Sequence, residues 1–505
     1  MLYNQFIKMK RHILYISGSL LLFFSHSAIA KEIKLLPVSS ESQACIGCHE
    51  GITPGIVEDW RTSRHSMTLP QMALKKPPLE RRISNESIPD NLRRVVVGCY
   101  ECHGQNPSIH KDSFDHMGFK IHVVVTPNDC KTCHTTEVAQ YLESKKANAV
   151  DNLAKNPVYT LLVDTITSVK EIKDNKIIIT KPSEHTKAET CFGCHGTVVE
   201  VKGMKTISTK LGEIEVPDLA NWPNQGVGRI NPDGSRGSCT ACHPRHSFSI
   251  EIARKPFTCA QCHLEPDVPA WEVYKESKHG NIFLSKQDKW NWDNVPWRPG
   301  KDFQAPTCAV CHNSLLVNPE GEVIAERTHN FGSRLWIRLF GLIYSHPQPK
   351  DGRTYLIKNS DGLSMPTTFS GGLAGEYLIN SDEQSRRRSN MEGICISCHS
   401  TDWAERFFDK MESSIMETDK MTHSATQSLV KAWDKGIADR TNPFDEPIEQ
   451  KWIKQWLFYA TSVRFASAMS GPDYATFKNG WWNLTENLGE ITKACKIKLK
   501  KIEAP

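Results

Sequence analysis

The chain has 505 residues, with 62 Lys and Arg against 57 Asp and Glu, and its formal net charge is +5 at pH 7. A charge this close to balance does not indicate a nucleic-acid-binding protein. Hydrophobic residues make up 39% of the chain, and after residue 30 no stretch is apolar enough to span a membrane. Composition therefore predicts a soluble chain with no stable membrane span.

The N-terminus has the pattern of a secretory signal peptide over residues 1–30. Basic residues within Lys8–Arg11 precede an apolar run over Ile13–Phe24, and Ala28–Ala30 form a small-x-small cleavage pattern. The apolar run is short for a membrane span, although an uncleaved anchor stays open. We expect the mature chain to be exported to a bacterial periplasm or an equivalent compartment.

Eight Cys-x-x-Cys-His motifs follow, and each predicts a covalently attached haem c. Two thiols bond to the haem vinyl groups, and the adjacent His is placed to ligate the iron. Zinc ribbons and disulfides explain the cysteine pairs less well, because neither needs a His after every pair. The motifs are Cys45–Cys48–His49, Cys99–Cys102–His103, Cys130–Cys133–His134, Cys191–Cys194–His195, Cys239–Cys242–His243, Cys259–Cys262–His263, Cys308–Cys311–His312 and Cys395–Cys398–His399.

Residues 31–400 carry all eight motifs and are predicted to form an octahaem cytochrome c domain. A chain this short cannot enclose every haem in a domain of its own, so the haems should lie close together and form much of the core. The segment is rich in Gly and Pro, which predicts loops and short helices. Ile172–Thr180 and Lys202–Val216 have β-like sequences, and we expect local hairpins there.

Residues 401–505 lack the motif and carry apolar residues at helical spacing, which predicts two or three long helices. Pro443–Pro447 and Gly471–Pro472 should separate them. The apolar faces could form an ordinary core or an oligomer seam. We therefore predict a mainly α fold, with a loop-rich multihaem cytochrome c domain and a C-terminal bundle of long helices. Cys495 lies outside the motifs and is interpreted as an inert helical thiol, with an intersubunit disulfide as the alternative.

A short repeat, aromatic-x-x-Ser-basic-X, ends at His65, Lys146 and His279. It indicates duplicated units in which X is a candidate ligand for a neighbouring haem iron, so His65 and His279 join the motif histidines as predicted ligands. Lys146 could be a ligand too, but a solvated charge is favoured because an ammonium group is strongly hydrated. The remaining histidines are numerous enough to give every iron a second His ligand. The weaker candidates are His110, His122, His329 and His423.

The segment Gly237–Gly280, with Pro244–Ser249 between its two motifs, closely resembles octahaem hydroxylamine oxidoreductases. The resemblance implies a mostly α-helical subunit, a homotrimer and chemistry on small nitrogen compounds. It also implies catalysis at the fourth haem, where His195 is the proximal ligand and the distal face is open. An Asp and a His move protons over that face in the family. Asp233 and His246 are the matching residues, although Asp233 could be a plain turn residue and His246 a ligand of another haem.

In the hydroxylamine-oxidising branch of that family, a Tyr from a neighbouring subunit is bonded to the catalytic haem. The matching residue is Tyr474, but the sequence after it departs from the family pattern, which favours the reductive direction on nitrite or hydroxylamine. The alternatives are oxidation of hydroxylamine or hydrazine, pure electron transfer, and reduction of sulfur oxyanions. Any of these would need a redox partner, either a cytochrome or a quinone-linked protein.

Overall fold

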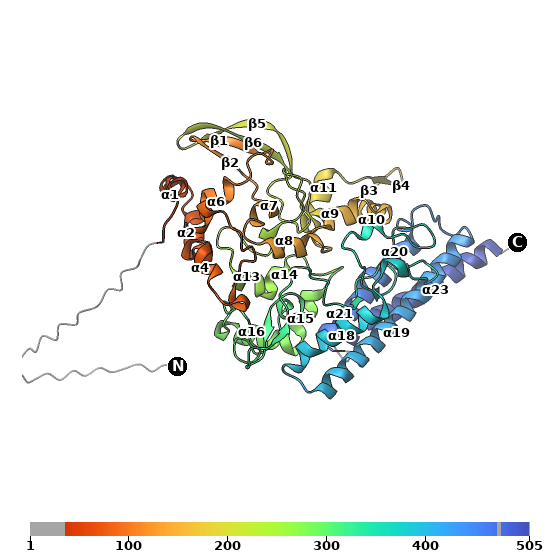
Figure 1. The fold of residues 1–505 in the computed structure, drawn as a ribbon. Coiled ribbons are helices and arrows are strands. Elements are labelled where there is room, and N and C mark those ends of the chain that lie inside the picture. Colours follow the sequence, from red (N-terminus) through yellow and green to blue (C-terminus); the bar gives the residue numbers. More distant parts are fainter. Residues whose placement is uncertain (1–35, 472–475, 504–505) are drawn as a thin grey trace, which may run out of the picture. The chain divides into compact units, whose positions relative to one another are not determined.

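The computed structural model describes residues 36–471 and 476–503, which form mostly short helices joined by long loops (Figure 1). The predicted signal peptide and Tyr474 both lie outside the described residues. The helices before residue 400 are α1 (Ser40–Ile52), α2 (Pro54–Thr62), α3 (Arg64–Met67), α4 (Pro70–Leu74), α5 (Asp90–Arg93), α6 (Cys99–His103), α7 (Pro127–Cys130), α8 (Thr135–Leu142), α9 (Ala149–Ala154), α10 (Pro157–Thr167), α11 (Glu184–Glu189), α12 (Cys191–His195), α13 (Ile250–Arg254), α14 (Pro256–Ala260), α15 (Ala270–Glu276), α16 (Lys278–Lys286), α17 (Cys308–His312) and α18 (Ser381–Ile396).

Three of these helices are one haem motif long, namely α6, α12 and α17. The motif itself explains their length and their chemistry. In a single helical turn, the second thiol at i+3 and the His at i+4 lie on the same side as the first thiol. A glycine follows two of them, Gly104 after α6 and Gly196 after α12. Gly196 has a φ of 101°, which favours glycine.

The aromatic-x-x-Ser-basic-X repeat has the same hydrogen bonds in all three copies. The Ser backbone N–H donates to the aromatic residue's carbonyl oxygen at 2.9, 2.9 and 3.0 Å, for Ser63, Ser144 and Ser277 in turn. Each Ser Oγ then accepts from the backbone N–H three residues later, at 3.2, 3.3 and 3.0 Å. This is the geometry of a helix N-cap. The repeat is therefore a capped turn that always places X at the same position.

Both segments predicted to be β-like form antiparallel hairpins, β3 (Val169–Lys173) with β4 (Lys176–Thr180), and β5 (Glu200–Thr209) with β6 (Gly212–Ala220). A third hairpin, which the sequence did not predict, pairs β1 (Ser113–His116) with β2 (Phe119–His122). Within the described residues every sheet has two strands. The remaining pairs are β7 (Leu316–Val317) with β8 (Val323–Ala325), and β9 (Ile337–Arg338) with β10 (His346–Pro347).

Long helices dominate after residue 400, as predicted. Four residues separate the end of α18 from the 34-residue α19, and the predicted domain boundary falls between these two helices. The elements are α19 (Thr401–Asp434), α20 (Pro447–Ile453), the π-helical η6 (Lys454–Ala460), α21 (Thr461–Met469), η7 (Phe477–Trp481) and α23 (Trp482–Glu503).

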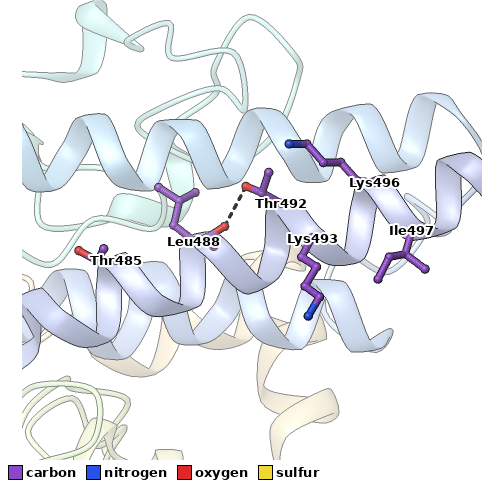
Figure 2. A pocket seen from close by; sticks show the side chains of 7 residues that line it. Thr485, Leu488, Thr492, Lys493, Lys496 and Ile497 are labelled. Atoms are coloured by element: carbon purple, nitrogen blue, oxygen red, sulfur yellow. Dashed lines mark hydrogen bonds between the residues drawn. The ribbon is translucent and has the colours of Figure 1, made fainter.

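The C-terminal helices pack around large buried side chains. Trp452 and Trp456 are fully buried, and Trp452 Nε1 donates to Thr426 Oγ1 of α19 at 2.9 Å. Cys495 is buried in α23, where its thiol donates to the Ser428 carbonyl oxygen at 3.5 Å. The outer face of α23 bears a groove of about 610 Å³, lined by residues of that helix alone (Figure 2). In the described part of the chain, no helix is long and apolar enough to cross a membrane.

Candidate haem sites and a cationic centre

Four motif histidines face a second histidine across a nearly constant gap. The ring centroids lie 6.2 Å apart for His49 and His116, and 6.4 Å for His134 and His65. The gap is 6.0 Å for His103 with His122 and 6.1 Å for His399 with His279. Two imidazoles on opposite sides of one metal ion, each bound at about 2 Å, have centroids roughly 6 Å apart. These pairs fit haem irons with two His ligands.

The cysteines and several buried ring nitrogens fit the same cofactor. All sixteen motif thiols are outside disulfides, so they can bond to haem. Ring nitrogens of His122, His329 and His346 are buried without a hydrogen-bond partner. A buried polar atom without a partner is unfavourable unless something binds it, and an iron ion is a suitable partner. The described residues therefore fit haem c, whose iron would supply one-electron chemistry at these sites.

Each X residue of the repeat lies against the His of a later motif. His65 faces His134 of the third motif, and His279 faces His399 of the eighth. Lys146 occupies the same position against the sixth motif, with its Nζ 3.2 Å from His263 Nε2. The structure therefore contradicts the interpretation of Lys146 as a solvated charge. Its side chain is half-buried and also lies over the Phe331 ring, because the capped turn directs X inward.

Lys146 belongs to a group of cations near the fourth motif. Burial, together with the charges of Lys146 and Arg338, lowers the pKa of His195 to about 4. Such a shift keeps the imidazole neutral, which is the form that ligates iron. Burial, with the charges of Arg338 and Arg387, also lowers the pKa of Lys145 to about 7. We call Lys145, Lys146 and Arg338 the cationic centre.

The cationic centre lacks neutralising carboxylates. Lys145 Nζ donates to the Gln348 side-chain oxygen at 2.7 Å, and Arg338 lies over the Phe340 ring. Among the residues that the structure describes, no Asp or Glu forms an ion pair with any of the three cations. Positive charges gathered without carboxylate partners favour the binding of an anion.

Asp233 lies in a turn. Its carboxylate accepts hydrogen bonds from Thr126 Oγ1 at 2.8 Å and Asn128 Nδ2 at 2.9 Å, beside α7. The Ser235 backbone N–H and hydroxyl donate to its other oxygen, at 2.9 and 2.6 Å. This arrangement is typical of a carboxylate that fixes a turn. The predicted proton-transfer role of Asp233 remains a prediction.

His246 lines a shallow surface hollow of about 550 Å³ with Thr53, Ile56, Asp59 and Arg245. Burial and the neighbouring charge of Arg245 lower the pKa of His246, while the charge of Asp59 opposes the shift. The structure thus places His246 beside α2, and the role predicted for it over the fourth haem remains a prediction.

The weaker ligand candidates lie in different environments. His122 faces His103, whereas His110 stacks on His122 at 3.5 Å and hydrogen bonds to Asp112 and Asp129. His329 has an orphaned Nδ1, and the charge of His243 helps burial to lower its pKa to about 4. His423 Nδ1 lies 3.2 Å from Tyr344 Oη.

Sequence reasoning missed His116, Lys145, Arg338 and His346. His116 comes from the β1–β2 hairpin, and its partner His49 is 67 residues earlier in the chain. Arg338 and His346 are paired in register on β9 and β10. No local spacing marks these residues, because tertiary structure alone brings His116 to His49 and the charge of Arg338 near His195.

Comparisons with known proteins agree with this geometry. Residues 230–329 match the family model described as seven times multi-haem cytochrome CxxCH, and residues 129–215 match that of cytochrome c554 and c-prime. A solved structure named a hypothetical multiheme protein is 45% identical, with a TM-score of 0.87, and the match covers 93% of this chain and 98% of that one. A reducing HAO-like protein complex from Kuenenia stuttgartiensis has a similar fold, with 19% identity, a TM-score of 0.60 and coverage of 92% and 86%.

A curated relative from Kuenenia stuttgartiensis is named a probable nitrite reductase-hydroxylamine oxidoreductase fusion protein. It is 24% identical over 421 residues, which are 80% of this chain but 39% of the relative, so this chain spans about two fifths of its length. The fold and the motifs together define a multihaem c-type cytochrome with covalently bound haem. The chain belongs to the multihaem c-type cytochromes, and its fold is similar to that of a reducing HAO-like protein complex.

Proposed function

We propose that this chain is an octahaem cytochrome c that reduces small oxidised nitrogen compounds at one haem, while the other seven carry electrons. Nitrite is the first candidate substrate and hydroxylamine the second. The observation that carries this proposal is the position of Lys146. It takes the place of a second His ligand at the sixth motif, and its charge also faces His195 of the fourth.

The cationic centre supports the reductive direction. Nitrite is an anion at neutral pH, whereas hydroxylamine is uncharged, so cations without carboxylate partners favour nitrite. The charges of Lys145, Lys146 and Arg338 would attract such an anion toward the fourth and sixth motifs. Haem propionates are the other anions that these cations can bind. The experiment must therefore measure turnover as well as binding.

The roles of the residues follow from these positions. A bound haem c supplies an iron that passes electrons one at a time to a ligand on its open face. His195 is the proposed proximal ligand of that iron, and a neutral imidazole suits the role. Lys146 would hold the anion by charge and by N–H donation. Asp233 and His246 remain proposed proton carriers for the nitrogen compound on the open face.

The test is turnover by the haem-loaded protein with reduced methyl viologen as electron donor. Replacement of Lys146 by Met should lower kcat/KM for nitrite by about 100-fold, the usual effect of removing one transition-state donor. Lys155→Met is the matched control, since Lys155 is an exposed lysine paired with Asp151. Equal activity of the two variants would contradict the assignment of Lys146.

Three other outcomes separate the alternatives. If nitrite, hydroxylamine and carbon monoxide leave the absorbance of the reduced protein unchanged, every iron is closed and the chain only transfers electrons. Faster turnover of tetrathionate or sulfite than of nitrite would favour sulfur oxyanions, which the same cations can bind. A Tyr474 peptide bonded to the Cys191–His195 haem peptide in a tryptic digest would instead favour oxidation of hydroxylamine or hydrazine.

We also propose that the mature chain is exported to the periplasm as a homotrimer with eight haems. The N-terminal pattern of residues 1–30 and the family resemblance support this. The intact mass of the purified protein tests signal-peptide cleavage and the haem count together, and light scattering tests the trimer.

A further inference from the structure

The eighth motif carries a stack of aromatic rings that leads from its histidine to solvent. The Trp403 ring stacks on His399, with centroids 3.9 Å apart and planes at 15°, and Phe407 stacks on Trp403 at 5.3 Å and 11°. Trp403 and Phe407 lie one turn apart on α19, so their side chains meet on one face. Trp403 is 43% exposed. A predicted iron ligand is thus in direct contact with a surface tryptophan.

The thioether edge of the eighth haem site is also at the surface. Of the sixteen motif cysteines, Cys48 and Cys398 are the exposed residues. Ile396, two residues before Cys398, is 41% exposed and adds apolar surface near the motif. A partly exposed Trp among apolar neighbours is a common anchor of protein interfaces. A patch of this size suits the small, transient interfaces of electron-transfer proteins.

The first motif is the competing site, because Cys48 is exposed as well. Its His49 faces His116, and its Nδ1 lies 2.9 Å from Thr53 Oγ1. Within the described residues, no surface aromatic ring stacks on His49. The eighth motif therefore offers the more direct route from solvent to an iron ligand.

The rim of the patch is basic on the side that Trp403 faces. Arg406 and Lys410 lie one and two turns further along the same face of α19, and both are exposed. Arg406 is held by Asp402, which leaves Lys410 as the uncompensated charge. A partner with acidic groups around its cofactor would be complementary to this rim.

We propose that the surface of Ile396, Cys398, Trp403, Arg406 and Lys410, here called the Trp403 surface, is the electron port of the chain. A small acidic electron-transfer protein docks there with the edge of its redox cofactor against Trp403. One electron passes in each encounter from the reduced partner, which is oxidised, to the iron held by His399 and His279, which is reduced, and no atom is transferred. The inward direction rests on the reductive function proposed above, whereas the location does not.

The port is tested by stopped-flow reduction of the haem-loaded protein with flavodoxin hydroquinone, an acidic donor, followed at the haem absorbance. Trp403→Ala should slow the reduction by about tenfold or more, the effect of losing one interface anchor. Trp403→Phe should restore most of the rate, because it keeps a stacked ring. Trp482→Ala is the matched control, since Trp482 is 61% exposed on α23, remote in sequence from any motif. This control should leave the rate unchanged.

A charge variant tests the kind of partner. Lys410→Glu should slow reduction by flavodoxin at low salt, and the difference should disappear near 0.5 M salt, where surface charges are screened. Lys496→Glu, which changes an exposed lysine in the α23 groove, is its control (Figure 2). Equal rates of reduction of Lys410→Glu and the wild type by flavodoxin at low salt would overturn the acidic partner.

Reduction by dithionite shows whether a variant has lost partner binding or has damaged haem sites, because this small donor needs no docking surface. Equal dithionite rates and equal haem content in all variants are expected. If Trp403→Ala is reduced by flavodoxin as fast as the wild type, or if dithionite reduction slows in parallel, the port is not at Trp403. Failure of nitrite turnover would leave these rates unaffected, so the port and the proposed function can fail separately.

Discussion

Residues 36–157 and the helices α19 to α23 differ in what their side chains pack against. The first segment surrounds haem sites, and the second packs apolar side chains on one another. Among the described residues, all members of the three hydrophobic clusters lie after residue 157. The first segment instead holds three haem motifs and three of the four imidazole pairs. The C-terminal helices carry no motif and bury Trp452 and Trp456 completely. One region is therefore organised by its cofactors and the other by its own side chains.

The largest effect should come from removing the first three haems. Replacing the six motif cysteines between Cys45 and Cys133 with Ala prevents their attachment. Residues 36–157 should then lose most of their amide protection, because little apolar packing remains to order them. The helices α19 to α23 should keep theirs. Hydrogen exchange with mass spectrometry measures both regions in one sample, and full protection of residues 36–157 would refute the comparison.

A core truncation should do the reverse. Trp452→Ala removes a fully buried ring that contacts Phe369 and Phe444. We expect it to destabilise the C-terminal helices by about 3–5 kcal/mol, the usual effect of such a cavity. The haem absorbance should not change. Denaturant unfolding followed by far-ultraviolet circular dichroism measures the loss, with exposed Trp482→Ala as the control.

The smallest effect concerns a buried carboxyl in the helical region. Burial raises the pKa of Glu449 to about 7, even though Trp433 Nε1 donates to it at 2.7 Å. The folded state therefore favours the protonated carboxyl. This contribution to stability is complete below the ordinary pKa near 4.5 and is lost as the pH rises through about 7.

The Tm of the wild type should accordingly fall further between pH 5 and pH 8 than the Tm of Glu449→Gln. The expected difference is on the order of 1–2 °C for a chain of this size, and scanning calorimetry can measure it. Glu490→Gln is the control, because Lys451 lowers the pKa of that exposed carboxyl. An identical pH dependence in wild type and Glu449→Gln would show that Glu449 titrates normally.

The sequence predicted features that are encoded locally. The haem motifs, the hairpins around residues 170–180 and 200–220 and the long C-terminal helices each depend on spacing or composition within a few turns of chain. The Ser-capped repeat was visible for the same reason, and it pointed to His65 and His279. The prediction that Lys146 is a solvated charge was wrong. It considered the strong hydration of a lysine but not the capped turn, which directs the side chain inward.

The residues that the sequence could not identify are brought together by tertiary structure. His116 reaches His49 through a hairpin, and Arg338 and His346 meet on two short strands with no distinctive sequence pattern. The family resemblance placed Asp233 and His246 over the fourth haem. The structure shows Asp233 in a turn against α7 and His246 beside α2, and their roles over that haem stay predictions.

In the capped turn of the repeat, different residues fix the backbone and present a side chain to the haem site. The serine and the aromatic carbonyl fix the path of the backbone, so the side chain at X is free to vary without disturbing it. A histidine at X can ligate a neighbouring haem iron, whereas a lysine at X adds a positive charge at that site. A single substitution at X can therefore change the group offered to a neighbouring haem while the backbone around it stays the same.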